Sequence, residues 1–567
     1  MPPSPPPPLF AAVESHVVRW DAQKSPREFP PGFVTLALPQ PAAPSTSTST
    51  STDPSSSAGT SAGSAGSFLS GLVDALFSKP PPPPPSAQPD EPSAASAARA
   101  PAPAPTECAF LPLSPVDQFC AQFDGIGVGW AFRGSLSPAA LLKSLARTVT
   151  ELYPHLTGRI VKAPSALNQA TGLRSRIAVR CSNEGFPFIV GQLANVPVDA
   201  LSLEDPLMRA FTVGAIAVPE LKFSTSGAIH HPLIKVHVCR LVDNPDITII
   251  GLCIIHAVMD GSGFFRFFKD WSDVHQDMAA AATAIPRCVF ETSKMMDGIA
   301  LDELQRLQDD FADLPSESPR RTMQQVSVLK FPIFAARALA SSLTTGGFAI
   351  HFTDAEIANM KHAASAGLSP GEYVTTNDVL AAHMWRITAK LRELPLHSPV
   401  HMHMFMNMRN RKASLPDLYG TAATLQASVT MGVDELSNEP FHRIVQHLHA
   451  TVQSNGETQF NADISWLQRQ ADENDMSRMM IGADLLRNGT ILTHWAHFPV
   501  FGADFGTGHP FFLLHGAPPP LPNFILVSSA PPGLGGVVVY GTLPNSQARA
   551  LMQEPWKSWL HSFRSQS

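Results

Sequence analysis

The stretch ITIIGLCIIHAVMDGSGFFRFFKDW, residues 247–271, decides the fold of its part of the chain. An apolar run ends at His256, a turn follows at Asp260 and Gly261, and aromatic residues then recur at helical spacing as far as Trp271. The pattern predicts a buried strand, a tight turn and a buried helix. A histidine at the end of a buried strand can hold one ring nitrogen toward a cavity, as a general base requires. A histidine satisfied within the core is the alternative, because His-x-x-x-Asp-Gly alone is a weak motif.

Strand and helix patterns continue on both sides of this stretch. Further strands are predicted at 14–20, 176–180, 186–190, 234–241, 401–407, 424–430 and 524–529. Helices are predicted at 136–152, 262–278, 355–365 and 376–392. The two types mix without a strict βαβ rhythm or an internal repeat, which favours an α/β body in two lobes.

Composition excludes several classes of protein. The chain has 567 residues with 47 acidic against 40 basic side chains, a net charge of -7, and no Lys/Arg cluster, so we expect no nucleic-acid binding. Six scattered cysteines argue against a disulfide scaffold and a zinc site. The apolar run 247–259 is well short of the roughly 20 residues that cross a bilayer. The start, MPPSPPPP, does not look like a signal peptide, so we expect a cytoplasmic protein without a transmembrane segment.

Proline is concentrated near the N-terminus, with 24 of 54 in the first 105 residues. Residues 41–105 are rich in Pro, Ser and Ala, and we predict a disordered insertion there. Within it, apolar residues at 68–77 have helical spacing, which predicts either a short amphipathic helix that docks elsewhere or a transient helix without a role. The run PPPPPP at 80–85 suits a protein partner that recognises polyproline.

Several further stretches, taken with the first, resemble the BAHD family of acyl-CoA-dependent acyltransferases, which includes plant hydroxycinnamoyl and anthocyanin acyltransferases and is related to fungal trichothecene acetyltransferases. THWAHFPVFGADFGTGHP at 493–510 is similar to the family's Ser-Trp-x-x-x-Pro and Asp-Phe-Gly-Trp-Gly-Lys-Pro signatures, with Thr507 and His509 in place of the tryptophan and the lysine. Weaker matches in the same order as the family's lie at 111–119, 141–160, 180–188, 375–386 and 407–420.

The resemblance implies two chloramphenicol-acetyltransferase-like lobes of mixed sheet flanked by helices, with a channel between them. We expect an N-terminal segment at 1–40 with a first strand, the insertion at 41–105, a lobe at 106–330 that carries the histidine motif, and a lobe at 331–567 that carries DFGTG. We expect a monomer.

The resemblance also assigns roles. It makes His256 the catalytic base and gives Asp260 an orienting role through an ion pair with an arginine, for which Arg409 and Arg411 are the candidates. Gly261 permits the tight turn, and the DFGTG loop is a structural element near the coenzyme side of the channel. By position, Thr493, His494 and Trp495 are candidates to line the channel, with core packing as the alternative. The loop residues concerned are Asp504, Gly506 and Gly508.

The function implied is transfer of an acetyl or longer acyl group from acyl-CoA to a hydroxyl of a secondary metabolite such as a terpenoid, a glycolipid sugar or a phenolic, without a covalent intermediate. Acyl-CoA is a co-substrate, and we expect no bound cofactor. Histidines at 230, 231, 237, 401 and 403 lack a carboxylate or cysteine at metal-ligand spacing, so we expect no metal. The alternatives are N-acylation, a condensation-type enzyme with a carrier-bound acyl donor, and a non-catalytic scaffold. Ile255 speaks against a condensation enzyme, since condensation domains usually have a second histidine there.

Overall fold

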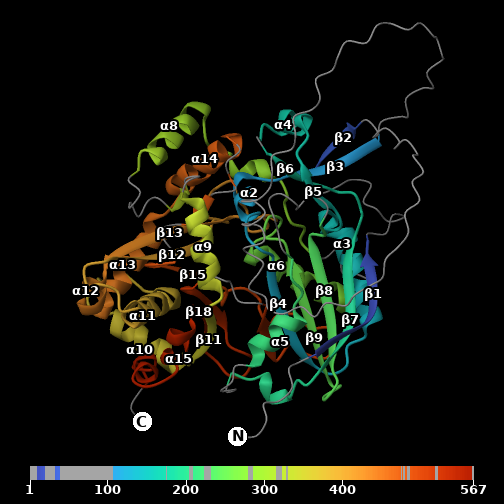
Figure 1. Ribbon diagram of the computed structural model, residues 1–567. Helices are drawn as coiled ribbons and strands as arrows, with labels where there is room; N and C mark the ends of the chain where they lie inside the picture. The colour runs from blue at the N-terminus through green and yellow to red at the C-terminus, as the bar shows by residue number, and fades with distance from the viewer. Residues whose placement is uncertain are drawn as a thin grey trace, which may run out of the picture.

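The computed structural model describes residues 9–19, 32–38, 106–173, 175–203, 209–221, 231–278, 285–314, 322–326, 330–473, 476, 479–481, 486–516 and 522–564. These residues form two lobes, each built around a six-stranded mixed sheet with helices packed against it (Figure 1). This confirms the fold class predicted from the sequence. The proline-rich insertion, with its segment at 68–77, lies outside the described residues.

The first lobe has the strand order β1-β7-β8-β9-β4-β16. Its strands are β1 (Leu9–Val18), β4 (Ile126–Arg133), β7 (Phe186–Ala194), β8 (Ile234–Leu241), β9 (Ile247–Ile254) and β16 (Phe512–His515). Every residue of β9 is buried, because its apolar side chains enter the core on both faces of the sheet. Helices α3 (Pro138–Glu151) and α6 (Gly261–Gln276) pack together over one face, and α5 (Arg209–Ala217) covers the other.

The second lobe has the strand order β11-β18-β17-β15-β12-β13. Its strands are β11 (Thr345–Phe352), β12 (Pro399–Asn407), β13 (Thr424–Gly432), β15 (Gly489–His494), β17 (Phe524–Ser529) and β18 (Val537–Pro544). The largest core of the molecule lies between one face of this sheet and the helices α10 (Asp354–Ala364), α11 (Thr376–Leu391) and α13 (Phe441–Ser454).

The other face of this sheet turns toward the first lobe. Thr493, Leu526 and Tyr540 lie side by side across three strands and therefore share a face. The ring of Tyr540 lies 4.1 Å from that of His515 in β16 and 6.4 Å from that of Phe211 in α5. The two lobes thus meet along this face.

Smaller elements complete the fold. A four-stranded sheet joins β2 (Val34–Leu38), β3 (Thr106–Pro112), β6 (Ile177–Arg180) and β5 (Arg159–Lys162), and β10 (Met323–Gln325) pairs with β14 (Met479–Ile481). The remaining helices are α2 (Pro115–Cys120), α4 (Ser165–Thr171), α8 (Leu301–Ala312), α9 (Phe331–Ser342), α12 (Val433–Asn438), α14 (Glu457–Glu473), α15 (Asn545–Leu551) and α16 (Trp556–Leu560). Within the described part of the chain, no helix combines the length and apolar character needed to cross a membrane.

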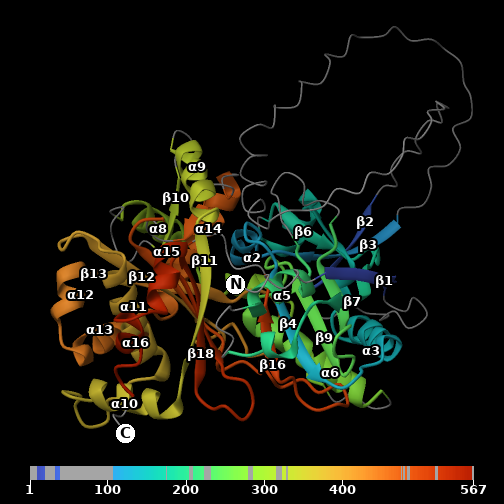
Figure 2. The same cartoon turned by 60° about the horizontal axis from the view of Figure 1, so that its bottom comes forward.

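The structure departs from the sequence prediction in two places. The first strand begins at Leu9 rather than Glu14, because Phe10 also packs inward, stacked on His237 with ring centroids 5.3 Å apart. The lobes are also not two uninterrupted stretches of chain. β16 comes from the second half of the sequence yet pairs with β4 in the first lobe (Figure 2), since Phe512, Leu513 and Leu514 are buried there.

Candidate active site

His256 lies in the turn that follows β9. The backbone N–H of Ile255 donates to the carbonyl of Leu233 at 2.9 Å, and the N–H of Val258 donates to the carbonyl of Ile255 at 3.2 Å. These bonds fix the chain on both sides of the histidine. The ring of Phe123 packs edge-on against the imidazole, with centroids 6.2 Å apart. The histidine is therefore held on a rigid element rather than on a free loop.

Burial favours the neutral form of the His256 imidazole. Burial lowers its pKa below the ordinary 6.5, and the nearby Asp260 carboxylate only partly opposes that shift. Its Nδ1 is buried without a hydrogen-bond partner among the described residues, yet the residue as a whole keeps part of its surface accessible. A neutral, partly accessible imidazole can accept a proton from another group.

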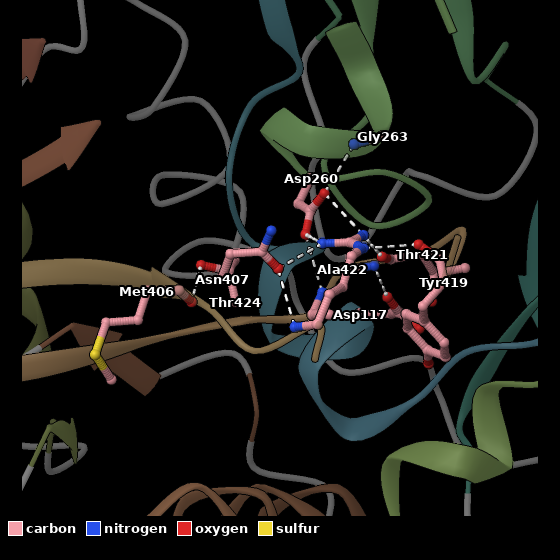
Figure 3. A network of polar contacts seen from close by, with 11 residues as sticks. Asp117, Asp260, Gly263, Met406, Asn407, Tyr419, Thr421, Ala422 and Thr424 are labelled. Atoms are coloured by element: carbon pink, nitrogen blue, oxygen red, sulfur yellow. Dashed lines mark hydrogen bonds and ion pairs between the residues drawn. The ribbon is translucent and has the colours of Figure 1, made fainter. Parts of the chain in front are cut away.

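Asp260 begins α6 and is almost completely buried. Its Oδ1 accepts from the N–H of Gly263 at 3.0 Å, which caps the helix, and from Nη2 of Arg409 at 3.1 Å. Its Oδ2 accepts from Nη1 of Arg409 at 2.7 Å and from the N–H of Ala423 at 3.0 Å (Figure 3). Burial alone would raise the pKa of this carboxyl, but Arg409 and these donors hold it below its ordinary value. Two bonds to each oxygen leave the carboxylate no free acceptor site for His256.

The guanidinium of Arg409 also uses all of its hydrogen-bond donors. Besides its two bonds to Asp260, its Nε donates to the carbonyl of Tyr419 at 2.9 Å and its Nη2 to the carbonyl of Thr421 at 2.7 Å. Its Nη1 also donates to Oδ1 of Asn407 at 3.1 Å. All five N–H groups of the guanidinium are thus used, in an ion pair that is nearly free of solvent. Of the two arginines expected from the sequence, the structure pairs Arg409 with Asp260.

Arg411 lies elsewhere. It is exposed, and its Nη1 makes a long contact of 3.5 Å with the carbonyl of Val452.

Gly261 lies where the segment after β15 crosses the start of α6. A Cβ at this position would stand 3.1 Å from Cε2 of Phe498 and 3.5 Å from Nε1 of Trp495. The indole of Trp495 also packs edge-on against Phe265 at 5.2 Å. A side chain here would require Phe498 to move by a few tenths of an ångström, and the backbone of Gly261 does not need a positive φ.

Thr493 and His494 lie on opposite faces of β15, because side chains alternate along a strand. Thr493 lies on the face that turns toward the first lobe, as described above. His494 lies on the same face as Val527, within the second lobe. Thr493, His494 and Trp495 therefore do not all line one surface, because His494 lies on the opposite face of β15 from Thr493.

The DFGTG loop is a tight turn anchored on the first lobe. Oδ1 of Asp504 accepts from the N–H of Gly506 at 2.7 Å and of Gly508 at 3.0 Å, and both glycines have φ near +90°. Phe505 is buried among Phe132, Phe268 and Trp271. A structural role for the loop follows from these contacts.

Of the histidines considered as metal ligands in the sequence, His401 and His403 have hydrogen-bond partners on β13, and His230 lies outside the described residues. Nδ1 of His401 lies 2.8 Å from Oγ1 of Thr430, and Nδ1 of His403 lies 2.7 Å from Oγ of Ser428. Across the ranges that the structure describes, no three His, Cys, Asp or Glu side chains are grouped so that they could hold a metal ion.

Sequence reasoning gave no role to Asp117, which lies in the matched stretch 111–119 and belongs to the same polar network. It is fully buried, its Oδ1 accepts from the N–H of Ala422 at 2.9 Å, and burial raises its pKa to about 7. The pattern Ser114-x-x-Asp117 before an apolar run is the signature of a helix capping box and could have identified it as structurally fixed. Its contact with a loop 305 residues away has no sequence signal.

Comparison with protein families gives a match over most of the chain. A model described as the Transferase family matches residues 102–557. Among curated proteins, the chain is 23% identical to hydroxycinnamoyl-CoA:5-hydroxyanthranilate N-hydroxycinnamoyltransferase of Avena sativa over 398 residues, which is 69% of this chain and 79% of that protein. It is 22% identical to rosmarinate synthase of Plectranthus scutellarioides over 380 residues, 66% of this chain and 77% of that one.

Solved structures give the same fold. TRI101 of F. sporotrichioides, in complex with coenzyme A and T-2, superposes with a TM-score of 0.59 at 16% identity, covering 79% of this chain and 98% of that one. TRI101 of F. graminearum, in complex with ethyl coenzyme A, gives a TM-score of 0.58 at 13% identity with the same coverage. At such low identity the likeness shows the fold alone.

Proposed function

The chain belongs to the Transferase family of BAHD-type, acyl-CoA-dependent acyltransferases, and from this premise we propose that it acylates a hydroxyl of a secondary metabolite with His256 as general base. The observation that carries the proposal is the partly accessible imidazole held between β9 and α6, while the Asp260 carboxylate accepts hydrogen bonds from other donors on both oxygens. Asp260 and Gly261 then shape the turn and do not touch the reacting atoms.

The reaction proceeds by direct transfer. His256 takes the proton of the acceptor hydroxyl, and the oxygen attacks the thioester carbonyl carbon of acyl-CoA. The tetrahedral intermediate collapses with cleavage of the C–S bond, and the imidazolium returns its proton to the departing thiolate. An ester and free coenzyme A are formed, and the histidine is neutral again. Trp495 and Thr493 line the space in which the two substrates meet.

Two sets of relatives support an acyl-CoA donor. The name of the Avena sativa relative specifies transfer from hydroxycinnamoyl-CoA, and the two TRI101 structures were solved with coenzyme A or an ethyl derivative of it. The acceptor differs among these proteins, since one plant relative is named for N-acylation and the fungal complex contains T-2. We therefore propose acyl-CoA as co-substrate and an alcohol as acceptor, with amines as the alternative.

The decisive experiment measures thiol release by the purified protein from acetyl-, medium-chain and aromatic acyl-CoAs, with a pooled metabolite extract as acceptor. We expect release that requires the extract and disappears in His256→Ala. No release with any donor, from a folded protein, would contradict the proposal and favour a carrier-bound donor or a scaffold.

A matched pair of acceptors separates O- from N-acylation. An alcohol and an amine on the same carbon skeleton are offered in competition, and the products are treated with mild alkali, which cleaves esters and leaves amides. We expect the alkali-labile product to dominate, and a stable product would replace O-acylation by N-acylation.

The pH dependence of kcat/KM tests the protonation state of the base. Since burial lowers the pKa of His256 below 6.5, the neutral form persists to more acidic pH than for a free imidazole. We expect activity to be constant at neutral pH and to fall on the acid side with an apparent pKa below 6.5. An acid limb centred above pH 7 would mean that another group limits the reaction.

A further inference from the structure

Helix α2 brings a second buried carboxylate to the polar network behind His256. Oδ2 of Asp117 accepts from the N–H of Ser114 at 2.9 Å, and Oγ of Ser114 accepts from the N–H of Asp117 at 3.2 Å, so the two residues form a reciprocal helix cap. A cap of this kind uses one carboxylate oxygen. The other oxygen, Oδ1, is directed out of the helix.

That second oxygen reaches the loop between β12 and β13 in the second lobe. Oδ1 of Asp117 accepts from the N–H of Ala422, and Oδ2 of Asp260 accepts from the N–H of the next residue, Ala423 (Figure 3). The two carboxylates come from two different helices, α2 and α6, and they hold adjacent peptide groups of one loop. The two N–H groups belong to consecutive peptide planes that meet at the Cα of Ala422, so only the φ and ψ angles of that one residue separate them.

The same loop holds Arg409 in place. The carbonyls of Tyr419 and Thr421 accept from the guanidinium, and the backbone of Gly420 is fixed in turn by its N–H, which donates to the carbonyl of Val289 at 2.8 Å. The carbonyl of Thr421 shares a peptide group with the N–H of Ala422, so a displacement of that peptide moves an acceptor of Arg409 and, through Arg409, Asp260.

We propose that Asp117 is a positioning residue for the catalytic histidine: by holding the N–H of Ala422 it fixes the loop that aligns Arg409 with Asp260, and thereby the turn that carries His256. This inference rests on the proposed function for its kinetic consequence. Its structural consequence, a fixed environment for His256, can be measured without turnover.

Asp378 provides a matched control. It occupies the same position in the capping box of α11, accepts from the N–H of Thr375 at 2.8 Å, and is 2% exposed, compared with 0% for Asp117. Its further partner is His449 in α13, at 2.8 Å, and not the loop that holds Arg409. Asp117→Asn and Asp378→Asn therefore each remove the charge of a buried capping carboxylate, but only the first weakens a contact with the loop that holds Arg409.

The experiment compares these two variants of the full chain. At position 117 an asparagine places its NH₂ group against the N–H of Ser114 or that of Ala422, and a buried donor without a partner costs about 1–3 kcal/mol. We expect both variants to melt at a lower temperature. We expect kcat to fall about tenfold or more in Asp117→Asn, with KM for acyl-CoA little changed, and to stay near the wild-type value in Asp378→Asn. Equal losses of kcat in the two variants would reduce Asp117 to a helix cap and overturn the proposal.

A readout independent of turnover separates this inference from the proposed function. The pH dependence of His256 modification by diethyl pyrocarbonate, read by mass spectrometry, reports the pKa of the imidazole even if no acyl transfer is found. The Asp260 carboxylate raises this pKa, and burial of the imidazole lowers it. We expect the midpoint to shift in Asp117→Asn and not in Asp378→Asn. An unchanged midpoint would contradict the proposal whether or not the wild type transfers an acyl group.

If Asp117→Asn does not fold, replacement of the peptide N–H of Ala422 by an ester oxygen removes the same bond and leaves both side chains intact. The same shift in the modification midpoint is expected, and its absence would overturn the proposal.

Discussion

Replacement of His256 by alanine is expected to lower kcat/KM for acyl transfer by roughly 10²- to 10⁴-fold, the usual contribution of a positioned general base. The loss should appear in kcat, because the proton is transferred only as the acceptor oxygen attacks. Folding should be little affected, since Nδ1 has no hydrogen-bond partner within the described residues whose loss would leave a donor or acceptor unsatisfied. The measurement is thiol release under saturating donor, with a thermal melt of the same preparation.

His237 is the control for this variant. It lies on the neighbouring strand β8, is also a partly buried histidine whose Nδ1 lacks a partner among the described residues, and burial lowers its pKa to about 4. Its ring stacks on Phe10 in β1, away from the turn that carries His256. We expect His237→Ala to reduce stability and keep kcat. Transfer within tenfold of wild type in His256→Ala, or an equal loss in both variants, would exclude His256 as the base.

The local elements around His256 could be predicted from the sequence because short-range pattern determines them. An unbroken apolar run makes β9 a central strand, and the spacing of the aromatic residues after Gly261 makes α6 an amphipathic helix. The same logic fails at β16, whose short apolar stretch follows a loop rich in glycine. β16 pairs with β4, which lies nearly 400 residues earlier in the chain. A periodic pattern within β16 cannot reveal such a distant pairing partner.

The resemblance predicted that Asp260 pairs with an arginine but did not identify which arginine. It left two candidates, which are two residues apart. The choice depends on the loop after β12, where Asn407 and the carbonyls of Tyr419 and Thr421 surround one guanidinium and not the other. Hydrogen bonds to backbone groups do not depend on which side chain the bonded residue carries, so the sequence does not reveal them. The contact of Asp117 with Ala422 could not be predicted for the same reason.

Arg409→Ala is expected to have the largest effect on stability, about 3–5 kcal/mol of the free energy of unfolding, because it leaves Asp260 buried without its countercharge. The carbonyls of Tyr419 and Thr421 also lose their donor. Arg409→Lys keeps the charge but offers three N–H groups instead of five and cannot bind both carboxylate oxygens in parallel, so we expect a partial loss. Arg411→Ala, at the exposed neighbour, should lie within about 0.5 kcal/mol of wild type.

Denaturant titration at several pH values separates the ion pair from simple packing at Arg409. Since the pKa of Asp260 in the folded protein lies below its ordinary 3.8, the pair stabilises the fold fully above about pH 4, and this stabilisation is lost as the pH falls through the folded pKa. Without Arg409 the effect of burial loses its main opponent, so the pKa of Asp260 in Arg409→Ala lies above that in the wild type, and protonation relieves the buried charge. The difference between wild type and Arg409→Ala should therefore shrink as the pH falls from the pKa of Asp260 in the variant to that in the wild type. A double variant, Asp260→Asn with Arg409→Met, removes both charges and should be more stable than Arg409→Ala alone, because no uncompensated carboxylate remains. A difference that does not change with pH, or a double variant as unstable as the sum of its single changes, would show that Arg409 acts through packing and not through its charge.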